Sequence, residues 1–277
     1  MINRPWCAKL ELTQDCNLRC KFCPISTIGP KKIHATPEIM AQIGTQLAEL
    51  NPDLRIEIAG RGEPLLAPDA VECVRRLREP LPHAHIGLFT NGVLLLKNPN
   101  LAKELFAAGL NILNVECYNG TYDRHRANME KTGVPVHHFS DFSAYRKHPR
   151  AKYPAIVLVP DILEDDARVR QLHNVAGAIP PVTYKPKQLP LAKRCAHPFR
   201  EITVNSDGEI SFCCVDWRHQ ASFGNVATTT LRKAWYSKKR RAMLTRLYNQ
   251  DRNFTPCREC DYHGGYRLGL IPNPAED

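Results

Sequence analysis

The sequence lacks long hydrophobic runs. None of its segments approaches the roughly 18 consecutive apolar residues that a transmembrane helix requires. Its start, MINRPWCAKLELTQDC, has no basic segment followed by an apolar stretch of signal-peptide length. We therefore expect a cytoplasmic protein with no membrane partner. Repeats and low-complexity segments are also absent, and a hydrophobic share of 43% in 277 residues predicts one large core with a small appended module.

Acidic residues are scarce relative to basic ones, at 28 against 38, which gives a formal net charge of +10. This excess favours an anionic partner such as nucleic acid, a nucleotide or a phosphorylated metabolite, although a cationic surface is also a common way to stay soluble. Two basic stretches favour phosphate contacts, with aromatic residues beside them as stacking sites would be. They are residues 146–152 (RKHPRAK) with Tyr145 and Tyr153, and Arg232, Lys233 and 238–241 (KKRR) with Trp235 and Tyr236.

Cysteine is what the sequence has in excess. Eleven cysteines are too many for an ordinary cytosolic enzyme and are an odd number for a set of disulfides. Most of them occur in clusters, which indicates metal ligation.

Short apolar runs alternate with amphipathic segments over the first two thirds of the chain, as in β/α units around a parallel sheet. Strands are predicted at 8–12, 55–59, 85–90, 111–116, 134–139 and 155–159, and helices at 36–50, 67–79, 100–109 and 165–178. Four prolines in 179–194 predict an extended connection, so we expect domains at 1–185 and 186–277. In the second domain, a hairpin is predicted around the turn at 205–208, followed by a helix at 230–247.

The first cysteine cluster follows the first predicted strand. Cys16, Cys20 and Cys23 have the spacing C-x-x-x-C-x-x-C, in a loop where barrel enzymes place their chemistry. Three thiolates can bind three irons of a cubane cluster and leave the fourth iron open. The alternatives are zinc, which ordinarily takes four ligands, and a structural cluster, which needs its fourth cysteine close by.

The segment ELTQDCNLRCKFCP, with Phe22 directly before the third cysteine, resembles the cluster-binding loop of the radical S-adenosylmethionine (SAM) superfamily. The resemblance implies that Cys16, Cys20 and Cys23 hold a 4Fe-4S cluster whose open iron is chelated by SAM. Cleavage of SAM then yields a 5′-deoxyadenosyl radical that abstracts a substrate hydrogen. It also implies the α/β class, a partial (β/α)6 TIM-like barrel, and an electron donor such as flavodoxin or ferredoxin.

Two downstream motifs extend the resemblance. Residues 60–64 (GRGEP) resemble the superfamily's Gly-Gly-Glu-Pro motif, which binds the SAM amino group, and 90–92 (TNG) resemble its frequent Thr-Asn-Gly. Arg61 replaces the first family glycine, so it could narrow the cleft or place a cation near the substrate. Glu116 either contacts the SAM methionine or ribose or is an exposed strand-end carboxylate. The residues expected to bind SAM are Phe22, Gly60, Arg61, Gly62, Glu63, Pro64, Thr90, Asn91 and Glu116.

The second cysteine cluster lies in the tail and contains Cys195, Cys213, Cys214, Cys257 and Cys260. Four converging thiolates suit zinc or a fully coordinated iron–sulfur cluster. The pattern, closed by one C-x-x-C pair, resembles the SPASM domains and in particular their shorter twitch version. The resemblance implies one auxiliary 4Fe-4S cluster held by Cys195, Cys213, Cys257 and Cys260, with Cys214 as the alternative to Cys213. This cluster either transfers electrons or only stabilises the module.

Cys7, Cys73, Cys117 and Cys214 remain. Cys73 is expected in the core. Cys117 and Cys214 either pack or donate a hydrogen atom to a substrate radical, with Cys117 at the mouth of the barrel.

The predicted function is hydrogen abstraction that leads to isomerisation, oxidation or epimerisation of a modified base in nucleic acid or of a nucleotide. A base within a duplex would have to be flipped out. The alternatives are a dehydrogenase or epimerase of a natural-product sugar or aminocyclitol, a peptide-modifying enzyme, and a non-catalytic nucleic-acid binding module with structural clusters.

Overall fold

The structure is a computed structural model that describes residues 4–139, 154–162, 174–179, 187–262 and 274. The strands in this part of the chain are β1 (Cys7–Leu10), β2 (Arg55–Ile58), β3 (His85–Thr90), β4 (Ile112–Tyr118), β5 (Val136–His138), β6 (Ala155–Ile162), β7 (Glu201–Val204), β8 (Glu209–Ser211) and β9 (Ser222–Asn225). The helices are α1 (Ile25–Ile28), α2 (Pro37–Leu50), η1 (Pro64–Leu66), α3 (Ala70–Arg78), α4 (Val93–Lys97), α5 (Asn100–Ala107), α6 (Tyr122–Glu130), α8 (His197–Arg200), α9 (Leu231–Trp235), α10 (Lys238–Tyr248) and η5 (Cys257–Glu259).

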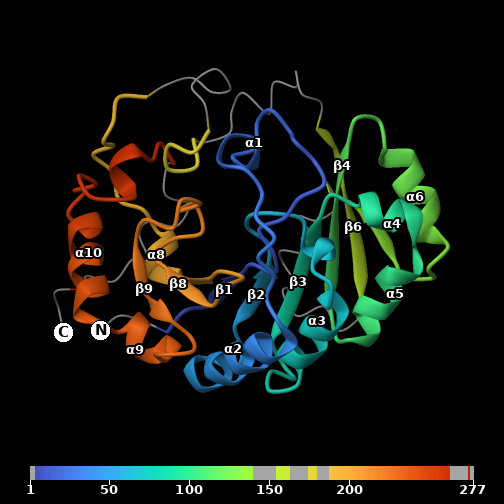
Figure 1. The fold of residues 1–277 in the computed structure, drawn as a ribbon, viewed down its shortest axis with the longest axis horizontal. Coiled ribbons are helices and arrows are strands. Elements are labelled where there is room, and N and C mark those ends of the chain that lie inside the picture. The colour runs from blue at the N-terminus through green and yellow to red at the C-terminus, as the bar shows by residue number, and fades with distance from the viewer. Residues whose placement is uncertain (1–3, 140–153, 163–173, 180–186, 263–273, 275–277) are drawn as a thin grey trace.

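The described strands form one sheet in the order β5-β6-β4-β3-β2-β1-β7-β8-β9. From β5 to β7 every neighbouring pair is parallel, and β1 to β4 follow one another in chain order. Helices follow these strands, with α2 and α3 below β1 to β3 and α4 to α6 beside β4 and β6 (Figure 1). The predicted fold class, a partial barrel of β/α units with a small C-terminal module, is confirmed.

The last two strands of the barrel do not follow chain order, since β6 pairs with β4 and β5 lies at the edge beyond it. Residues 155–158 of β6 are all buried, whereas the three residues of β5 are partly or fully exposed. A fully apolar strand is stable between two neighbours, and a short polar strand suits an edge.

Helix α2 begins and ends as predicted because its sequence supplies the caps. The Thr36 side chain accepts a hydrogen bond from the Ile39 backbone N–H at 3.3 Å, and Pro37 takes the first helical position. Helix α3 begins at Ala70, three residues later than predicted, because residues 64–66 form the turn η1. The predicted helix at 165–178 lies mainly outside the described residues.

The C-terminal module joins the barrel sheet directly. Strands β7 and β8 form the predicted antiparallel hairpin, and β7 also pairs in parallel with β1 from Cys7↔Glu201 to Leu10↔Val204. The predicted helix at 230–247 is wrong in one respect, since it is two helices, α9 and α10. Ser237 separates them because its side chain accepts a hydrogen bond from the Arg240 backbone N–H at 3.2 Å and caps α10.

The predicted domain boundary near residue 186 falls among residues outside the described ranges and stays a prediction. None of the helices in the described part of the chain is long and apolar enough to cross a membrane.

Candidate active site

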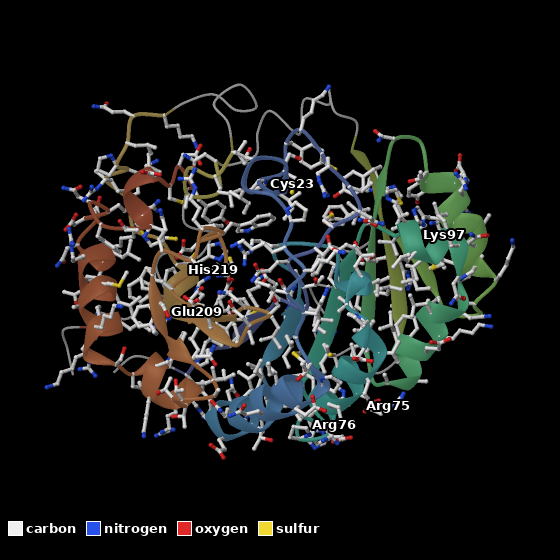
Figure 2. All side chains as sticks on the ribbon, in the orientation of Figure 1. Cys23, Arg75, Arg76, Lys97, Glu209 and His219 are labelled. Carbon is white, nitrogen blue, oxygen red and sulfur yellow. The ribbon has the colours of Figure 1, made fainter. Side chains whose placement is uncertain are left out.

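The first three candidate ligands lie on the loop between β1 and α1. This loop is at the carboxyl ends of the parallel strands, and Figure 2 shows Cys23 there, opposite the end that carries Arg75 and Arg76. Cys16, Cys20 and Cys23 are all partly exposed. Backbone bonds shape the loop, as the Cys23 N–H donates to the Cys20 carbonyl at 3.0 Å. Burial raises the pKa of Cys23 to about 12, and the nearby Cys20 and Cys16 add to the rise. Such a group of thiols suits a metal, which binds thiolates as their protons leave.

The loop over residues 60–64 packs tightly against the cysteine loop. Gly62 has a φ of 77°, and a Cβ there would lie 2.5 Å from the carbonyl oxygens of Thr13 and Asp15. The Glu63 N–H donates to the Asp15 carbonyl at 2.7 Å. Only glycine fits this approach, so the two loops form one rigid unit beside Cys16.

Glu63 is the centre of a buried polar network. Its carboxylate accepts hydrogen bonds from the Thr90 hydroxyl at 2.6 Å, the Asn91 N–H at 2.7 Å and the Leu65 N–H at 3.1 Å. Asn91 in turn donates through its side chain to Asn17 in the cysteine loop at 2.8 Å. Burial raises the pKa of Glu63 to about 7. Three residues that the sequence singled out, Glu63, Thr90 and Asn91, therefore meet at one site.

Glu116 and Phe22 are linked by a residue that the sequence reasoning missed. The Tyr118 hydroxyl donates to the Glu116 carboxylate at 2.5 Å, and its ring stacks on Phe22 with centroids 6.0 Å apart and planes at 26°. Burial raises the pKa of Glu116, and this hydrogen bond opposes the rise. The period of two along a strand places residues 116 and 118 on one face, which is the signal that could have found Tyr118.

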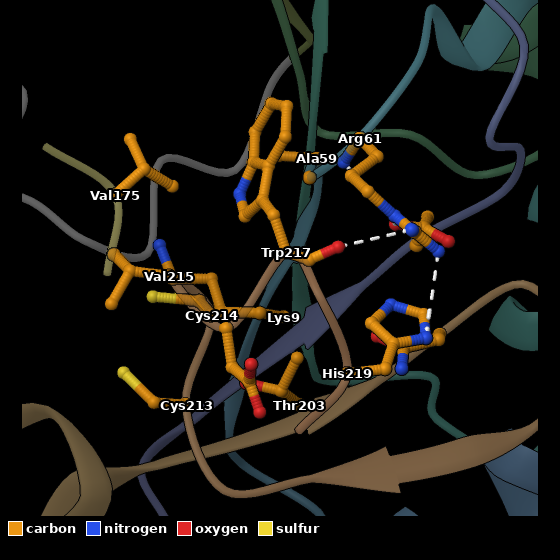
Figure 3. A pocket seen from close by; sticks show the side chains of 14 residues that line it. Lys9, Ala59, Arg61, Val175, Thr203, Cys213, Cys214, Val215, Trp217 and His219 are labelled. Atoms are coloured by element: carbon orange, nitrogen blue, oxygen red, sulfur yellow. Dashed lines mark hydrogen bonds and ion pairs between the residues drawn. The ribbon is translucent and has the colours of Figure 1, made fainter. Parts of the chain in front are cut away.

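Arg61 is a buried link between the barrel and the C-terminal module. Its Nε lies 3.2 Å from the Glu11 carboxylate, Nη1 donates to the Trp217 carbonyl at 3.0 Å, and Nη2 lies 3.5 Å from Nδ1 of His219 (Figure 3). Glu11 also accepts a hydrogen bond from the Ser206 hydroxyl at 2.9 Å. The sequence pointed to a cation in the cleft but could not identify these partners.

A cavity of about 270 Å³ lies between the two parts of the molecule (Figure 3). The barrel contributes Lys9, Glu11 and residues 59–61, and the module contributes the loop from Cys213 to Trp217, His219 and strand residues of β7. Lys9 forms an ion pair with Glu57 next to the cavity, as Arg61 does with Glu11. The positive charges of the wall are therefore matched by buried carboxylates.

The four cysteines of the second group come together from three segments. Cys195 precedes α8, Cys213 follows β8, and Cys257 and Cys260 lie at η5. All four are less than a tenth exposed. Burial raises the pKa of Cys257 and Cys260, and the nearby Cys195 raises both further. The hydrogen bond with Cys214 is the main cause of the raised pKa of Cys213, and burial is the second. The nearby Cys195 adds a smaller rise.

Cys214 contacts a different set of groups. Its Sγ lies 3.7 Å from the Glu201 carboxylate and 4.0 Å from Nδ1 of His197, and those two side chains are 2.8 Å apart. Cys214 is also only half-buried and lines the cavity. This geometry favours Cys213 over Cys214 as the fourth ligand.

Two of the remaining cysteines lie in the core. Cys73 is buried there, as expected. Cys117 is 0% exposed and belongs to the same core, on the opposite face of β4 from Glu116. The expectation that it lies at the mouth of the barrel is wrong, and a thiol without access to the cavity cannot reach a substrate radical there.

The predicted basic surface on the tail helices is smaller than expected. Arg240 is 3% exposed and Trp235 is 1% exposed, with the Arg240 guanidinium 3.7 Å from the centre of the Trp235 ring. The prediction that these two residues belong to a surface phosphate site is therefore wrong. Arg240 lies on the buried face of α10 with Leu244 and Leu247. Residues 146–152 lie outside the described ranges. The exposed cations that remain in this stretch are Arg232 and Lys233 on α9 and Lys238 and Lys239 on α10, at the edge of the molecule away from α1 (Figure 1).

Known proteins share both regions of the chain. A family profile described as the radical SAM superfamily matches residues 10–150, and a SPASM profile described as an iron-sulfur cluster-binding domain matches residues 195–261. GTP 3′,8-cyclase of Peptoclostridium acidaminophilum is 38% identical over 110 residues, which is 39% of this chain and 32% of that protein. Molybdenum cofactor biosynthesis protein 1 of Bos taurus is 34% identical over 110 residues, 39% of this chain and 17% of that protein. The alignments thus span a third or less of these relatives.

Solved structures share the fold over a longer part of the chain. The crystal structure of BtrN in complex with AdoMet and 2-DOIA has a TM-score of 0.69 at 20% identity, and the match covers 95% of both chains. Native anSMEcpe with bound AdoMet and Kp18Cys peptide has a TM-score of 0.51 at 14% identity, covering 85% of this chain and 82% of that one. At these identities the likeness establishes the fold.

Proposed function

This chain belongs to the radical SAM superfamily and is an enzyme with SAM and two 4Fe-4S clusters as cofactors, and from that premise we propose that it oxidises a small, hydroxylated ring held between the barrel and the C-terminal module. The observation that carries the proposal is the cavity, whose walls come from the SAM-motif residues Gly60 and Arg61 on one side and from the Cys213–Trp217 loop on the other. A substrate there would be adjacent to both cofactor sites.

The two cysteine groups fit these cofactors. We assign Cys16, Cys20 and Cys23 to the SAM cluster, because three partly exposed thiols leave room for SAM as a further ligand. We assign Cys195, Cys213, Cys257 and Cys260 to the auxiliary cluster, because four buried thiols suit a closed site.

Polar groups around the cysteine loop suit SAM itself. Glu63 lies near Cys16, and Glu116 lies near Cys23. Burial is the main cause of the raised pKa of each cysteine, and the nearby carboxylate adds to the rise. Burial raises the pKa of both carboxyls. The ammonium and sulfonium charges of SAM would favour their ionised forms, which in turn attract SAM. The Phe22–Tyr118 pair supplies an aromatic surface for its adenine.

When bound, the SAM cluster and SAM supply a radical that takes a hydrogen atom, and the auxiliary cluster supplies an acceptor for the electron left behind. Oxidation of an alcohol carbon also releases the hydroxyl proton, and the chain must accept it. Asp216 lines the cavity, and burial raises its pKa, which makes it a stronger base than an exposed carboxylate. We assign this proton to Asp216.

The substrate class follows from size and charge. A cavity of about 270 Å³ accommodates a single sugar-sized ring. Lys9 and Arg61 in its walls are each paired with a carboxylate, which favours a neutral polar molecule over an anionic one. A nucleotide is the second candidate, favoured by the net charge of +10 and by relatives named GTP 3′,8-cyclase. Both candidates share a hydroxylated sugar ring as the reacting part.

The test is 5′-deoxyadenosine formation by protein reconstituted with iron and sulfide without oxygen, then mixed with dithionite and SAM. Three additions are compared: neutral metabolites that pass through an anion-exchange column, nucleotides retained on it, and nucleic acid. We expect stimulation by the neutral fraction. Stimulation by nucleotides alone would establish the second candidate, and stimulation by nucleic acid alone would overturn both and favour a base in a polymer.

Replacement of Trp217, a cavity residue, tests the location. Trp217→Ala is expected to raise the concentration of the stimulating fraction needed for half-maximal effect about tenfold, without changing SAM cleavage in its absence. The matched control is Trp6→Ala, since Trp6 is 48% exposed. Equal behaviour of the two variants would exclude the cavity as the substrate site.

A further inference from the structure

Two arginines are buried beside the second cysteine group. Arg240 is 3% exposed and Arg252 is 2% exposed. Neither has a carboxylate partner among the ion pairs of the described residues. A buried cation without a counter-charge is costly, so the site calls for an anion that the side chains do not supply.

Arg252 joins the segments that carry two of the four cysteines. Its guanidinium donates to the carbonyl oxygens of Lys193 at 2.8 Å, Arg194 at 2.9 Å and Tyr262 at 2.7 Å. Lys193 and Arg194 directly precede Cys195, and Tyr262 follows Cys260. These contacts hold the Arg252 guanidinium against the backbone next to Cys195 and Cys260.

Arg240 approaches the same group from helix α10. One face of its guanidinium lies on Trp235, and Nη2 donates to the Pro198 carbonyl. Its Nη1 is buried and has no hydrogen-bond partner in the described part of the chain. Pro198 lies three residues after Cys195. Burial lowers the pKa of Arg240 to about 9, and the nearby Cys213 opposes that fall. An unpaired buried N–H is costly, and a hydrogen bond to an anion would remove that cost.

We infer that Arg240 and Arg252 are the counter-charges of the auxiliary cluster, and that the unpartnered Nη1–H of Arg240 donates to one of its sulfur atoms. The inference rests on the auxiliary cluster assigned above. A 4Fe-4S core with four thiolates carries two negative charges in its oxidised form and gains a third on reduction, and two guanidinium groups balance the first two. Nearby positive charge and N–H donors to sulfur favour the reduced form, so these arginines raise the reduction potential of the cluster.

The experiment measures the midpoint potential of the auxiliary cluster alone. The full chain with Cys16→Ala, Cys20→Ala and Cys23→Ala serves as the parent, and its one remaining cluster is titrated electrochemically and followed by electron paramagnetic resonance. Arg240→Gln in this parent is expected to shift the equilibrium at least tenfold towards the oxidised form, which is about 59 mV more negative for one electron. Arg241→Gln, the same change at the next residue, is the control and is expected to leave the potential unchanged.

Arg240→Lys separates charge from packing, since it keeps the charge and is expected to give a smaller shift. A potential for Arg240→Gln equal to that of the control would overturn the inference. If Arg240→Gln loses its iron while Arg240→Lys keeps it, the counter-charge is needed to hold the cluster and the inference stands. If both lose their iron, the arginine acts through shape and the inference fails. A parent that binds zinc, or no metal, would instead disprove the auxiliary cluster itself, before either arginine is tested.

Discussion

The two cysteine groups differ in both access and charge. Cys16, Cys20 and Cys23 are partly exposed on a loop held by backbone contacts, whereas the four cysteines of the C-terminal module are buried. Carboxylates of Glu63 and Glu116 lie near the first group, and guanidinium groups of Arg240 and Arg252 lie near the second. An open site among carboxylates suits a cationic ligand, and a closed site among cations suits a cluster that accepts an electron.

The cavity connects these two environments. Its wall carries Arg61 from the motif next to the first group and Cys213 from the second group. The Arg61–Glu11 pair and its bond to the Trp217 carbonyl fix the distance between them. Under the proposed function, a substrate in the cavity would lie between a site that starts a radical reaction and a site that ends it.

The largest expected effect separates the two groups. Cys16→Ala is expected to abolish 5′-deoxyadenosine formation, because loss of one ligand removes the cluster to which SAM binds, and to lower the iron content by about four per chain. Cys195→Ala is expected to lower the iron content equally but to retain cleavage of SAM. Liquid chromatography of the nucleoside and iron analysis measure both. Cys73→Ala, in the core, is the control, and equal loss of cleavage in Cys16→Ala and Cys195→Ala would show that the groups are not independent.

The next largest effect tests the carboxylates of the open site. Glu63→Gln is expected to weaken SAM binding about tenfold, or about 1.4 kcal/mol, because it removes the negative charge and replaces the oxygen that accepts from the Asn91 N–H with an amide group that cannot accept. Equilibrium dialysis of labelled SAM with the reconstituted protein gives the Kd. Glu72→Gln, an exposed glutamate on α3, removes the same charge far from the loop. An unchanged Kd in Glu63→Gln would mean that the charge difference between the two sites has no role in SAM binding.

A test of stability, rather than of SAM binding, addresses the buried Arg61–Glu11 pair. Arg61→Gly, which restores the family glycine, is expected to lower the free energy of unfolding by about 3 kcal/mol, because it leaves the buried Glu11 carboxylate without its cation. Arg61→Gly combined with Glu11→Gln is expected to be more stable than the sum of the single changes predicts. Urea unfolding of the anaerobic protein, followed by tryptophan fluorescence, measures this. Additive effects would show that the two side chains do not stabilise each other.

The sequence predicted the barrel and the superfamily well because their signals are local. Strand positions follow from short apolar runs, and the C-x-x-x-C-x-x-C spacing lies within one loop. The network of Glu63, Thr90 and Asn91 was predictable only as separate motifs, since each follows a different strand and their meeting depends on the parallel order of β2 and β3.

What the sequence could not reveal depends on contacts between distant segments. The pairing of β7 with β1 turns the hairpin into part of the barrel sheet, and no local pattern encodes it. From the sequence, Arg240 was grouped with three neighbouring cations in the run KKRR at 238–241. Its burial depends on where Ser237 starts α10 and on which face of that helix meets the core, so the local sequence did not reveal it. The partners of Arg61 were hidden for the same reason, since Trp217 and His219 come from the far end of the chain.

The smallest expected effects concern the cysteines outside both groups. Cys117→Ala is expected to leave SAM cleavage and iron content within about twofold of the parent, because this thiol is enclosed by apolar side chains on the outer face of β4. Cys214→Ala is expected to keep the iron as well but to change the response to the stimulating fraction, because this residue lines the cavity. If Cys214→Ala lost four irons and Cys213→Ala did not, the fourth ligand would be Cys214, and the closed site would extend into the cavity wall. The difference in access between the two cysteine groups would then be a matter of degree, and a substrate in the cavity could touch the auxiliary cluster directly.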